Sequence, residues 1–386
     1  MSSEGRYGGL TTAERNEAAS HLIDQFPEGL PSPREIEELI IGHGFRGQER
    51  VRRQGATLLY THLKRALRLL LGEESPSSIG ARQNHLFIGA SGSGKTFLIE
   101  ILERIAGVPV IIEDLTQYTE TGIVGEDVST IMSRLYQKAG KRRGIAAMGI
   151  VVLDELDKLA VTEGDRRNGA APRLGVQRSL LTLLGSAQYD FPATVQNWTR
   201  AERKTIPMHG ITFVMAGAFS GIERLDGKKE NHAGVGFQAS PRRSGGEIFP
   251  SLAENLLEST DVFIEYGLVP ELLGRINHIA RFDPLNRQTL GEILDNNILP
   301  AYAKQFEDEG LRLEISEPAR EILLNKALAR QTAARGIEAA LSPAIEEAVY
   351  NYFGQDFEVG EKRPTVRLVS DCGRVRPVIG AEVAVN

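Results

Sequence analysis

The stretch GASGSGKT, residues 89–96, constrains the fold more than any other part of the chain. It matches the pattern G-x-x-x-x-G-K-[ST] and lies between an apolar segment predicted to be a strand, 85–89, and a segment with helical periodicity, 95–106. Glycines here allow a tight loop whose backbone N–H groups point at phosphate oxygens, and the helix that follows adds its N-terminal dipole. A flexible Gly/Ser linker would explain neither the Lys-Thr pair nor the flanking strand. The sequence therefore predicts a phosphate-binding loop.

A second motif supplies acidic partners for this loop. In GIVVLDELDK, residues 149–158, an apolar run is followed at once by Asp154 and Glu155. A continuous apolar run is typical of a strand buried on both faces, so the two acids are expected at its carboxyl end. Asp154 would hold Mg²⁺ through water, and Glu155 would orient and polarise the attacking water. A strand that ends in surface acids is the alternative, and it is less favoured beside a phosphate-binding loop.

Together the two motifs predict binding and hydrolysis of ATP with Mg²⁺. Lys95 is expected to reach the β- and γ-phosphates, and the Thr96 hydroxyl to ligate the metal together with Asp154. The predicted nucleotide-binding residues of the loop are Gly89, Ala90, Ser91, Gly92, Ser93, Gly94, Lys95 and Thr96.

Strand and helix patterns alternate along most of the chain, which predicts an α/β fold with a parallel sheet and helices on both faces. The expected strands are 85–89, 108–112, 149–153 and 211–216, and the expected helices are 95–106, 126–139 and 174–185. Later segments are mostly helical, at 289–306, 317–328 and 335–352, with a short strand at 365–369. We therefore expect a flexible tail or short helix at 1–29, a large ATPase domain at 30–285 and a small, mainly helical domain at 286–386.

Composition limits the classes of function. The 386-residue chain is long enough for two or three domains, and its net charge of −6 argues against general nucleic-acid binding. No apolar run approaches the roughly 18–20 residues that cross a bilayer, and the N-terminal residues lack the apolar core of a secretory signal. Cys372 is the single cysteine, so an internal disulfide and a cysteine-rich zinc module are both excluded. We expect a soluble, cytoplasmic protein.

The order of several motifs resembles the ClpX family of AAA+ protein unfoldases. These motifs are LPSPREIEELI, GASGSGKT, TETGIVGEDV, GIVVLDELDK, ITFVMAGAFSGIE, AGVGF, GLVPELLGRI and TAARGIEAAL, and they span about residues 30–355. The related unfoldase HslU carries a long inserted domain after its acidic strand, whereas a short stretch follows that strand here. The resemblance implies an AAA+ P-loop NTPase large domain, a small helical lid domain and a homohexameric ring.

The resemblance also gives roles to two arginines. Arg275, in ELLGRI, resembles an arginine finger that reaches the γ-phosphate in a neighbouring subunit, where a guanidinium suits the charge on the transferring phosphoryl group. Arg335, in AARG, resembles a second sensor that reports nucleotide state to the domain hinge. Either residue can instead be an ordinary surface arginine. The segment FRGQ, 45–48, stands where the family has Val-Ile-Gly-Gln beside the adenine, but Arg46 replaces an apolar residue.

The stretch TGIVGEDV, 121–128, resembles the family's channel loop, in which a tyrosine between glycines pushes on an unfolded polypeptide. Ile123 takes the tyrosine position and Val124 follows it, so the resemblance implies a modified grip on substrate. Local burial of Ile123 is the alternative. The second channel loop also departs from the family, because residues 172–174, Pro-Arg-Leu, replace Ser-Gly-Glu. The motor motifs match the family, and the substrate-handling motifs differ.

The segment AGVGFQAS, 233–240, resembles the loop by which the family docks onto the ClpP peptidase. Val235, Gly236 and Phe237 fit its aliphatic–Gly–aromatic pattern within a polar segment, where an apolar anchor is typical of a partner contact. A chance tripeptide is the alternative. Family members usually begin with a cysteine-ligated zinc domain, and residues 1–29 contain no cysteine. Substrate choice is therefore expected to depend on the channel, the tail or a separate adaptor.

The predicted function is that of an ATP-dependent protein unfoldase with no peptidase site of its own. It would use Lys95, Glu155 and Arg275 for catalysis, and would deliver unfolded or tagged proteins to a ClpP-like peptidase. A remodelling chaperone that acts without a protease is the first alternative. A nucleic-acid motor is the second, since TRAERKT, 199–205, holds a small basic cluster, although the acidic net charge counts against it. Neither membrane nor nucleic-acid binding is expected.

Overall fold

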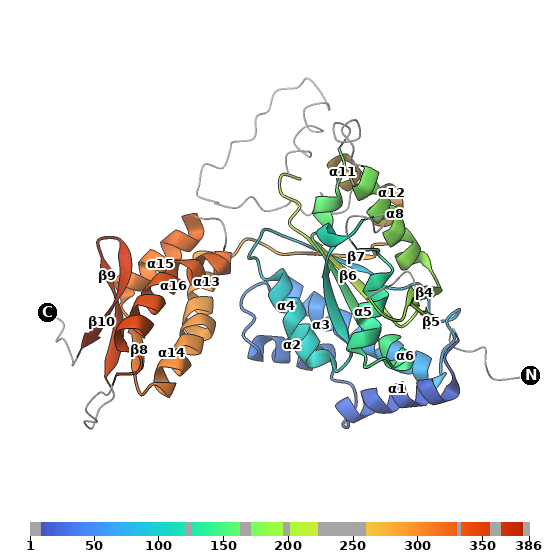
Figure 1. The fold of residues 1–386 in the computed structure, drawn as a ribbon, viewed down its shortest axis with the longest axis horizontal. Coiled ribbons are helices and arrows are strands. Elements are labelled where there is room, and N and C mark those ends of the chain that lie inside the picture. Colours follow the sequence, from blue (N-terminus) through green and yellow to red (C-terminus); the bar gives the residue numbers. More distant parts are fainter. Residues whose placement is uncertain are drawn as a thin grey trace, which may run out of the picture.

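The chain folds into a larger lobe, which carries the N-terminus, and a smaller lobe at the C-terminal side (Figure 1). This computed structural model describes residues 9–119, 126–162, 171–195, 201–222, 260–329, 333–355 and 364–380. The predicted channel residues, Ile123 and Val124, lie outside the described residues. So does the predicted partner loop, Val235, Gly236 and Phe237.

A parallel sheet forms the centre of the larger lobe. Within the described chain its strands are β1 (His85–Ile88), β2 (Val110–Asp114), β3 (Ile150–Asp154), β6 (Thr212–Gly217) and β7 (His278–Arg281). Their order is β2-β3-β6-β1-β7, and each neighbouring pair is parallel. The strands β1, β3 and β6 are buried almost throughout, as expected for strands covered on both faces. The predicted α/β fold class is confirmed, and β7 is an edge strand that the sequence analysis missed.

Helices cover both faces of this sheet. Their bounds are α2 (Pro33–Gly42), α3 (Glu49–Leu71), α4 (Lys95–Ala106), η2 (Leu115–Gln117), α5 (Thr130–Lys138), α6 (Arg143–Ala146), η3 (Leu156–Leu159), α8 (Ala171–Gly185), α11 (Thr260–Tyr266) and α12 (Pro270–Leu273). The crossovers from β1 to β2 and from β2 to β3 run along the sheet in opposite directions, so right-handed connections place α4 and α5 on opposite faces. Figure 1 shows α4 beside α2 and α3 on one side, and α5 beside α6 on the other.

A short hairpin, which the sequence analysis did not predict, holds part of the basic cluster. The strands β4 (Gln188–Pro192) and β5 (Arg203–Pro207) pair antiparallel. Arg203 Nη2 donates to the carbonyl of Asp190 at 3.0 Å, and Lys204 pairs with Glu202 at 2.8 Å. Arg200, the third basic residue, lies outside the described residues. The described members of the cluster therefore bind residues of the hairpin or of the segment directly before β5.

Residues 1–29, expected to be a flexible tail or a short helix, include one helix among the described residues. Residues Thr12–Gln25 form helix α1, whose first turn is closed by a capping box. The buried residues of α1 are Ala18, Ala19 and Leu22. Glu14 pairs with Arg143 of α6 at 2.8 Å, and this pairing lowers the pKa of Glu14 to about 2. The sequence left the tail and the helix both open, because the apolar stripe of this segment is short and is covered only by residues distant in sequence.

The smaller lobe has its own hydrophobic core. Its elements are α13 (Arg287–Ile293), the π-helical turn η4 (Leu294–Ile298), α14 (Leu299–Asp308), β8 (Arg312–Ile315), α15 (Glu317–Ala329), α16 (Ala333–Tyr352), β9 (Thr365–Asp371) and β10 (Arg374–Gly380). One core cluster runs from Leu10 to Phe282, and the second runs from Leu285 to Val375. The sequence pattern predicted one short strand here, whereas the described chain forms a sheet in the order β10-β9-β8. None of the described helices is long and apolar enough to span a bilayer.

Substitution of Gly144 tests the docking of α1 on α6. A Cβ added at Gly144 would lie 2.3 Å from the carbonyl oxygen of Glu14, a backbone atom that can move only with its helix. We expect Gly144→Ala to lower the free energy of unfolding by about 1–3 kcal/mol through overpacking, and to expose α1 to proteolysis. Gly42→Ala is the control, because its added Cβ meets nothing within 4 Å. Equal denaturation midpoints for the two variants would contradict this packing.

Candidate nucleotide-binding site

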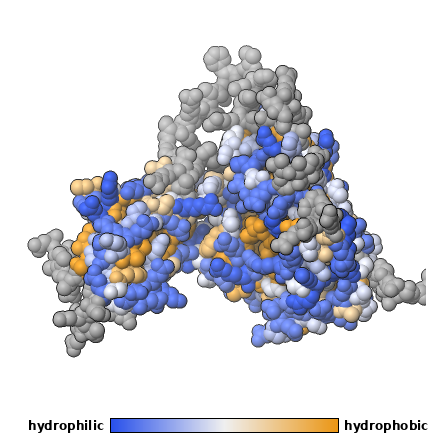
Figure 2. Space-filling model, in the orientation of Figure 1, coloured by the Kyte–Doolittle hydropathy of each residue, from blue (hydrophilic) through white to orange (hydrophobic). Residues whose placement is uncertain are grey.

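A cleft of about 380 Å³ lies between the two lobes. Figure 2 shows the lobes side by side, with the surface hollowed between them. The loop before α4 and the carboxyl end of β3 line it from the larger lobe, and residues of α13, η4 and α16 line it from the smaller lobe. The predicted site residues in its lining are Ser91, Gly92, Ser93, Gly94, Lys95, Thr96, Asp154, Glu155 and Arg335. The fold thus brings together residues that are far apart in the sequence.

The loop before α4 requires glycine at two points. Gly94 has a left-handed φ of +100° at the start of α4, a conformation that favours glycine. A Cβ at Gly89 would lie 2.6 Å from the Cβ of Phe282 and 2.7 Å from its carbonyl oxygen. Within this cradle Ser93 Oγ is buried and makes no hydrogen bond to the described part of the chain. An unpartnered hydroxyl beside a helix N-terminus fits a bound phosphate group.

Lys95 is the first residue of α4 and is largely buried in the cleft. Its Nζ donates to the carbonyl oxygens of Gly89, at 2.5 Å, and Ala90, at 3.0 Å. Burial lowers the pKa of Lys95, and nearby carboxylates, led by Asp154, act in the opposite direction. The ammonium group is therefore folded back onto its own loop. Phosphate oxygens would replace these carbonyls with stronger, charge-assisted hydrogen bonds.

Asp154 and Glu155 stand at the carboxyl end of β3. Asp154 Oδ1 accepts the backbone N–H of Glu155 at 2.8 Å. Glu155 has a left-handed φ of 59°, which is uncommon for a residue with a side chain and is frequent at functional sites. Burial, followed by the charge of Asp157, raises the pKa of Glu155. A carboxylate with a raised pKa at the edge of a polar cleft is suited to accept a proton.

Asp157 is a buried acid that the sequence analysis did not assign to the site. Its side chain is 1% exposed, and its Oδ2 pairs with Lys158 at 2.7 Å. Its Oδ1 accepts the backbone N–H of Ala218 at 3.1 Å. Ala218 directly follows β6. Asp157 thus connects the end of β6 to the segment after β3. In the sequence, its position two residues after Glu155 was the one signal that it could belong to the site.

Arg335 faces the cleft from the smaller lobe. Its charge contributes to the lowered pKa of Lys95, after the larger effect of burial, so two cations approach the same space. On the same wall, Asn297 of η4 donates from Nδ2 to the carbonyl of Gly44 at 2.7 Å. Such π-helical turns are frequent at functional sites. A polyanion bound in the cleft would therefore contact both lobes.

Phe45 and Arg46 also line the cleft, at the segment where the resemblance places the adenine. Phe45 is buried and stacks on Phe97, with ring centroids 6.2 Å apart. Arg46 Nη1 donates to the carbonyl of Ile41 at 3.1 Å. The guanidinium is thus held by the preceding helix, and the aliphatic stem of Arg46 is left to pack against a base.

Arg275 has a different position. It follows α12 and is exposed, and it is absent from the described residues that line the cleft. Its guanidinium lies 3.3 Å from the place that a Cβ on Gly185 would occupy. Its carbonyl accepts from Asn84 Nδ2 at 2.8 Å. The predicted arginine finger therefore lies apart from the cleft of its own chain.

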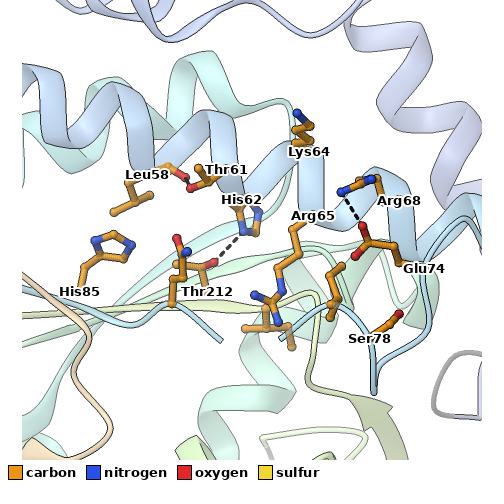
Figure 3. Close-up of a pocket in the computed structure, with 13 residues that line it drawn as sticks. Leu58, Thr61, His62, Lys64, Arg65, Arg68, Glu74, Ser78, His85 and Thr212 are labelled. Carbon is orange, nitrogen blue, oxygen red and sulfur yellow. Dashed lines mark hydrogen bonds and ion pairs between the residues drawn. The ribbon is translucent and has the colours of Figure 1, made fainter. Parts of the chain in front are cut away.

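A second hollow lies between α3 and the sheet (Figure 3). In this view His62 points toward Thr212, and Arg68 points toward Glu74. His62 Nδ1 lies 2.9 Å from Thr212 Oγ1 and Nε2 lies 3.0 Å from the carbonyl of Met148, and burial lowers the pKa of His62 to about 4. These polar groups already have partners within the chain, so we interpret this hollow as part of the packing and not as a ligand site.

Comparisons with known proteins agree with this geometry. Residues 81–279 match the family model of the AAA domain (Cdc48 subfamily), and residues 285–358 match that of the C-terminal, D2-small domain of ClpB protein. The chain is 33% identical over 345 residues to the "ATP-dependent Clp protease ATP-binding subunit ClpX" of Azotobacter vinelandii, covering 86% of this chain and 75% of the relative. Relatives of the same name from Bacteroides fragilis and Borrelia duttonii are 31% and 30% identical, covering 85% and 87% of this chain and 78% of each relative.

Replacement of Lys95 tests the phosphate cradle directly. We expect Lys95→Met to weaken MgATP binding about 10- to 100-fold, because a charge-assisted hydrogen bond contributes about 1.5–3 kcal/mol. Titration calorimetry on the purified chain measures this. Lys64→Met is the matched control, since Lys64 is exposed and lines the hollow under α3. If the Lys64 variant lost binding and the Lys95 variant kept it, the nucleotide would bind in the hollow under α3 and not in the cleft between the lobes.

Proposed function

The chain belongs to the ClpX family of AAA+ ATPases, and on this premise we propose that it uses ATP hydrolysis to unfold protein substrates and thread them through the centre of a ring. Membership makes the chain an ATP-binding AAA+ chaperone of the Clp type. Unfolding, threading and delivery to a ClpP-like peptidase are the proposal. The observation that supports it most is that one cleft receives Lys95, Asp154 and Glu155 from the larger lobe and Arg335 from the smaller lobe.

This shared cleft links hydrolysis to motion. A nucleotide that contacts both walls stabilises one relative position of the lobes, and loss of the γ-phosphate weakens the contacts of one wall. The differential contacts then shift the lobes toward another position. In this proposal Arg335 is the residue through which the smaller lobe responds to the nucleotide.

The chemistry assigns one task to each group. Lys95 neutralises charge on the phosphates and holds them against the loop, while Glu155 takes up a proton from the attacking water, which its raised pKa favours. Mg²⁺, which Thr96 and Asp154 would hold, neutralises phosphate charge when bound. Asp157 fixes the backbone beside Glu155 by its bond to Ala218.

The position of Arg275 supports a ring. Because it is exposed and apart from its own cleft, it would act on the nucleotide of a neighbouring subunit. A finger supplied in trans makes each site complete only between two copies. We therefore propose a closed ring, a homohexamer as in the family, in which isolated subunits are poor ATPases.

Substrate handling rests on segments outside the described residues. Ile123 and Val124 are proposed to contact the polypeptide in the channel, and Val235, Gly236 and Phe237 to dock a ClpP-like peptidase. A remodelling chaperone differs in one respect, since it would not need residues 235–237. Deletion of those three residues, followed by assay of unfolding with and without a peptidase, distinguishes the two functions.

Stimulation by substrate tests the proposed function. We expect the ATP turnover of the assembled protein to rise with an unfolded polypeptide and to remain unchanged with single-stranded DNA. Glu155→Gln is the control, and it should keep MgATP binding while losing turnover, because an amide cannot accept the proton of the attacking water. Turnover that ignores polypeptide, or that rises with DNA, would leave an AAA+ ATPase and overturn threading.

Mixing of two inactive variants tests the trans arginine. Arg275→Ala should lower turnover roughly 10³-fold without weakening nucleotide binding, since the finger acts on the transition state. When Arg275→Ala and Glu155→Gln subunits assemble together, sites that combine an intact Glu155 with an intact neighbouring Arg275 should restore turnover. Arg142→Ala, an exposed arginine elsewhere, serves as a control. A mixture as inactive as either variant alone would show that Arg275 does not act between subunits.

A further inference from the structure

Four polar side chains form a cluster at the end of β2, outside the nucleotide cleft: Glu113, Tyr118, Glu126 and Arg134. Tyr118 donates its hydroxyl to Glu113 Oε2 at 2.6 Å. Arg134 reaches Glu113 with Nη1 and donates from Nη2 to Glu126 Oε1 at 2.6 Å. One guanidinium therefore bridges two carboxylates that come from different segments of the chain.

The burial of this cluster is unequal. The side chain of Glu113 is 5% exposed, whereas those of Arg134 and Glu126 are 30% and 36% exposed. Burial, followed by the hydrogen bond to Glu113, raises the pKa of Tyr118, so its hydroxyl stays a donor. A buried ion pair adds little stability over apolar residues of the same size, because desolvation offsets the attraction. What a forked guanidinium contributes is fixed geometry between the groups it joins.

Arg134 contacts one end of a segment directly, at Glu126, and the other end indirectly, because Glu113 accepts the hydroxyl of Tyr118. Thr119 N donates to the carbonyl of Glu126 at 2.9 Å, and Glu126 N donates to the carbonyl of Gln117 at 3.1 Å. The chain therefore leaves the end of β2 and returns beside it at Glu126. Residues 120–125, which carry the predicted channel contacts, are the part of the chain between these two ends.

The same cluster is attached to the nucleotide site by one strand. Asp114, the last residue of β2 and the neighbour of Glu113, lies opposite Asp154 in the register of β2 and β3. Burial is the main cause of the raised pKa of Glu155, and the charge of Asp114 also contributes. Asp114 then accepts the N–H of Thr116 at 2.8 Å and so caps η2, the turn that leads to Tyr118. The path from the catalytic edge to the cluster is thus short and hydrogen-bonded.

We propose that Arg134 is a positioning residue that fixes both ends of residues 120–125 relative to the nucleotide site, so that contact with a polypeptide is coupled to ATP turnover. This inference rests on the proposed function, because it needs a polypeptide that bears on residues 120–125. Without the forked bridge, Glu113 and Glu126 would repel each other, and the direct link between the two ends would be the backbone hydrogen bonds of Thr119 and Glu126.

Arg134→Lys is the informative variant because it keeps the charge and loses the fork. We expect it to leave basal ATP turnover unchanged, to lower the thermal unfolding midpoint only slightly because the positive charge is kept, and to reduce the stimulation by unfolded polypeptide about fivefold. Glu126→Gln, which keeps the shape and weakens the bridge, should act in the same direction. Arg142→Lys is the matched control, since Arg142 makes an exposed ion pair with Glu17 at 3.6 Å.

A double-mutant cycle separates positioning from a merely structural role. If Arg134 acts through residues 120–125, Ile123→Ala should cost much less stimulation in the Arg134→Lys background than in the wild type. If the two substitutions reduced the stimulation independently, so that their effects multiplied, the proposal would be overturned. Equal stimulation of the wild type and Arg134→Lys would also overturn it. So would a fall in basal turnover as large as the fall in stimulation. If wild-type turnover ignores polypeptide, the proposed function fails, and this inference fails with it.

Discussion

A buried ammonium and the acids that face it occupy the carboxyl edge of the central sheet, and the functional part of the structure depends on this balance of charge. Lys95 would lose its proton more readily in its buried position, but Asp154 leads the carboxylates that oppose this change. An isolated charge in such a place costs several kcal/mol, so the cation and the acids need each other. Parallel pairing makes the arrangement possible, because β1 and β3 deliver the loop and the acids to the same edge.

The two lobes are joined around this edge by polar contacts as well as by the chain. Asn297 of the smaller lobe donates to the carbonyl of Gly44 in the larger lobe. Gln48 exchanges two hydrogen bonds, at 2.5 and 3.0 Å, with the backbone of Asp283, in the segment that leads from the larger lobe to the smaller one. Gly44 and Asn297 both line the cleft. A ligand in the cleft would therefore lie beside a contact between the two lobes.

The strands on either side of the catalytic carboxylates carry the effect outward. On one side Asp157 binds the backbone at Ala218, after β6, and on the other Asp114 pairs in register with Asp154. Each of these two aspartates accepts a backbone N–H: Asp157 that of Ala218, and Asp114 that of Thr116. The strands on both sides of β3 are thus tied to the segment that carries Asp154 and Glu155.

The sequence by itself determined the parallel α/β class, the phosphate loop around Lys95 and the acids at 154 and 155, because these depend on local chemistry: glycines for a tight turn, an apolar run for a buried strand. It missed the β4–β5 hairpin and the hydrogen bond of Asp157 to Ala218, and it left α1 open between a tail and a helix, because these patterns are too short to show a partner. Only the tertiary structure decided that Arg335 faces the cleft and that Arg275 does not. The reason is physical, since an arginine has the same charge and reach wherever it stands, and packing alone decides what lies within that reach.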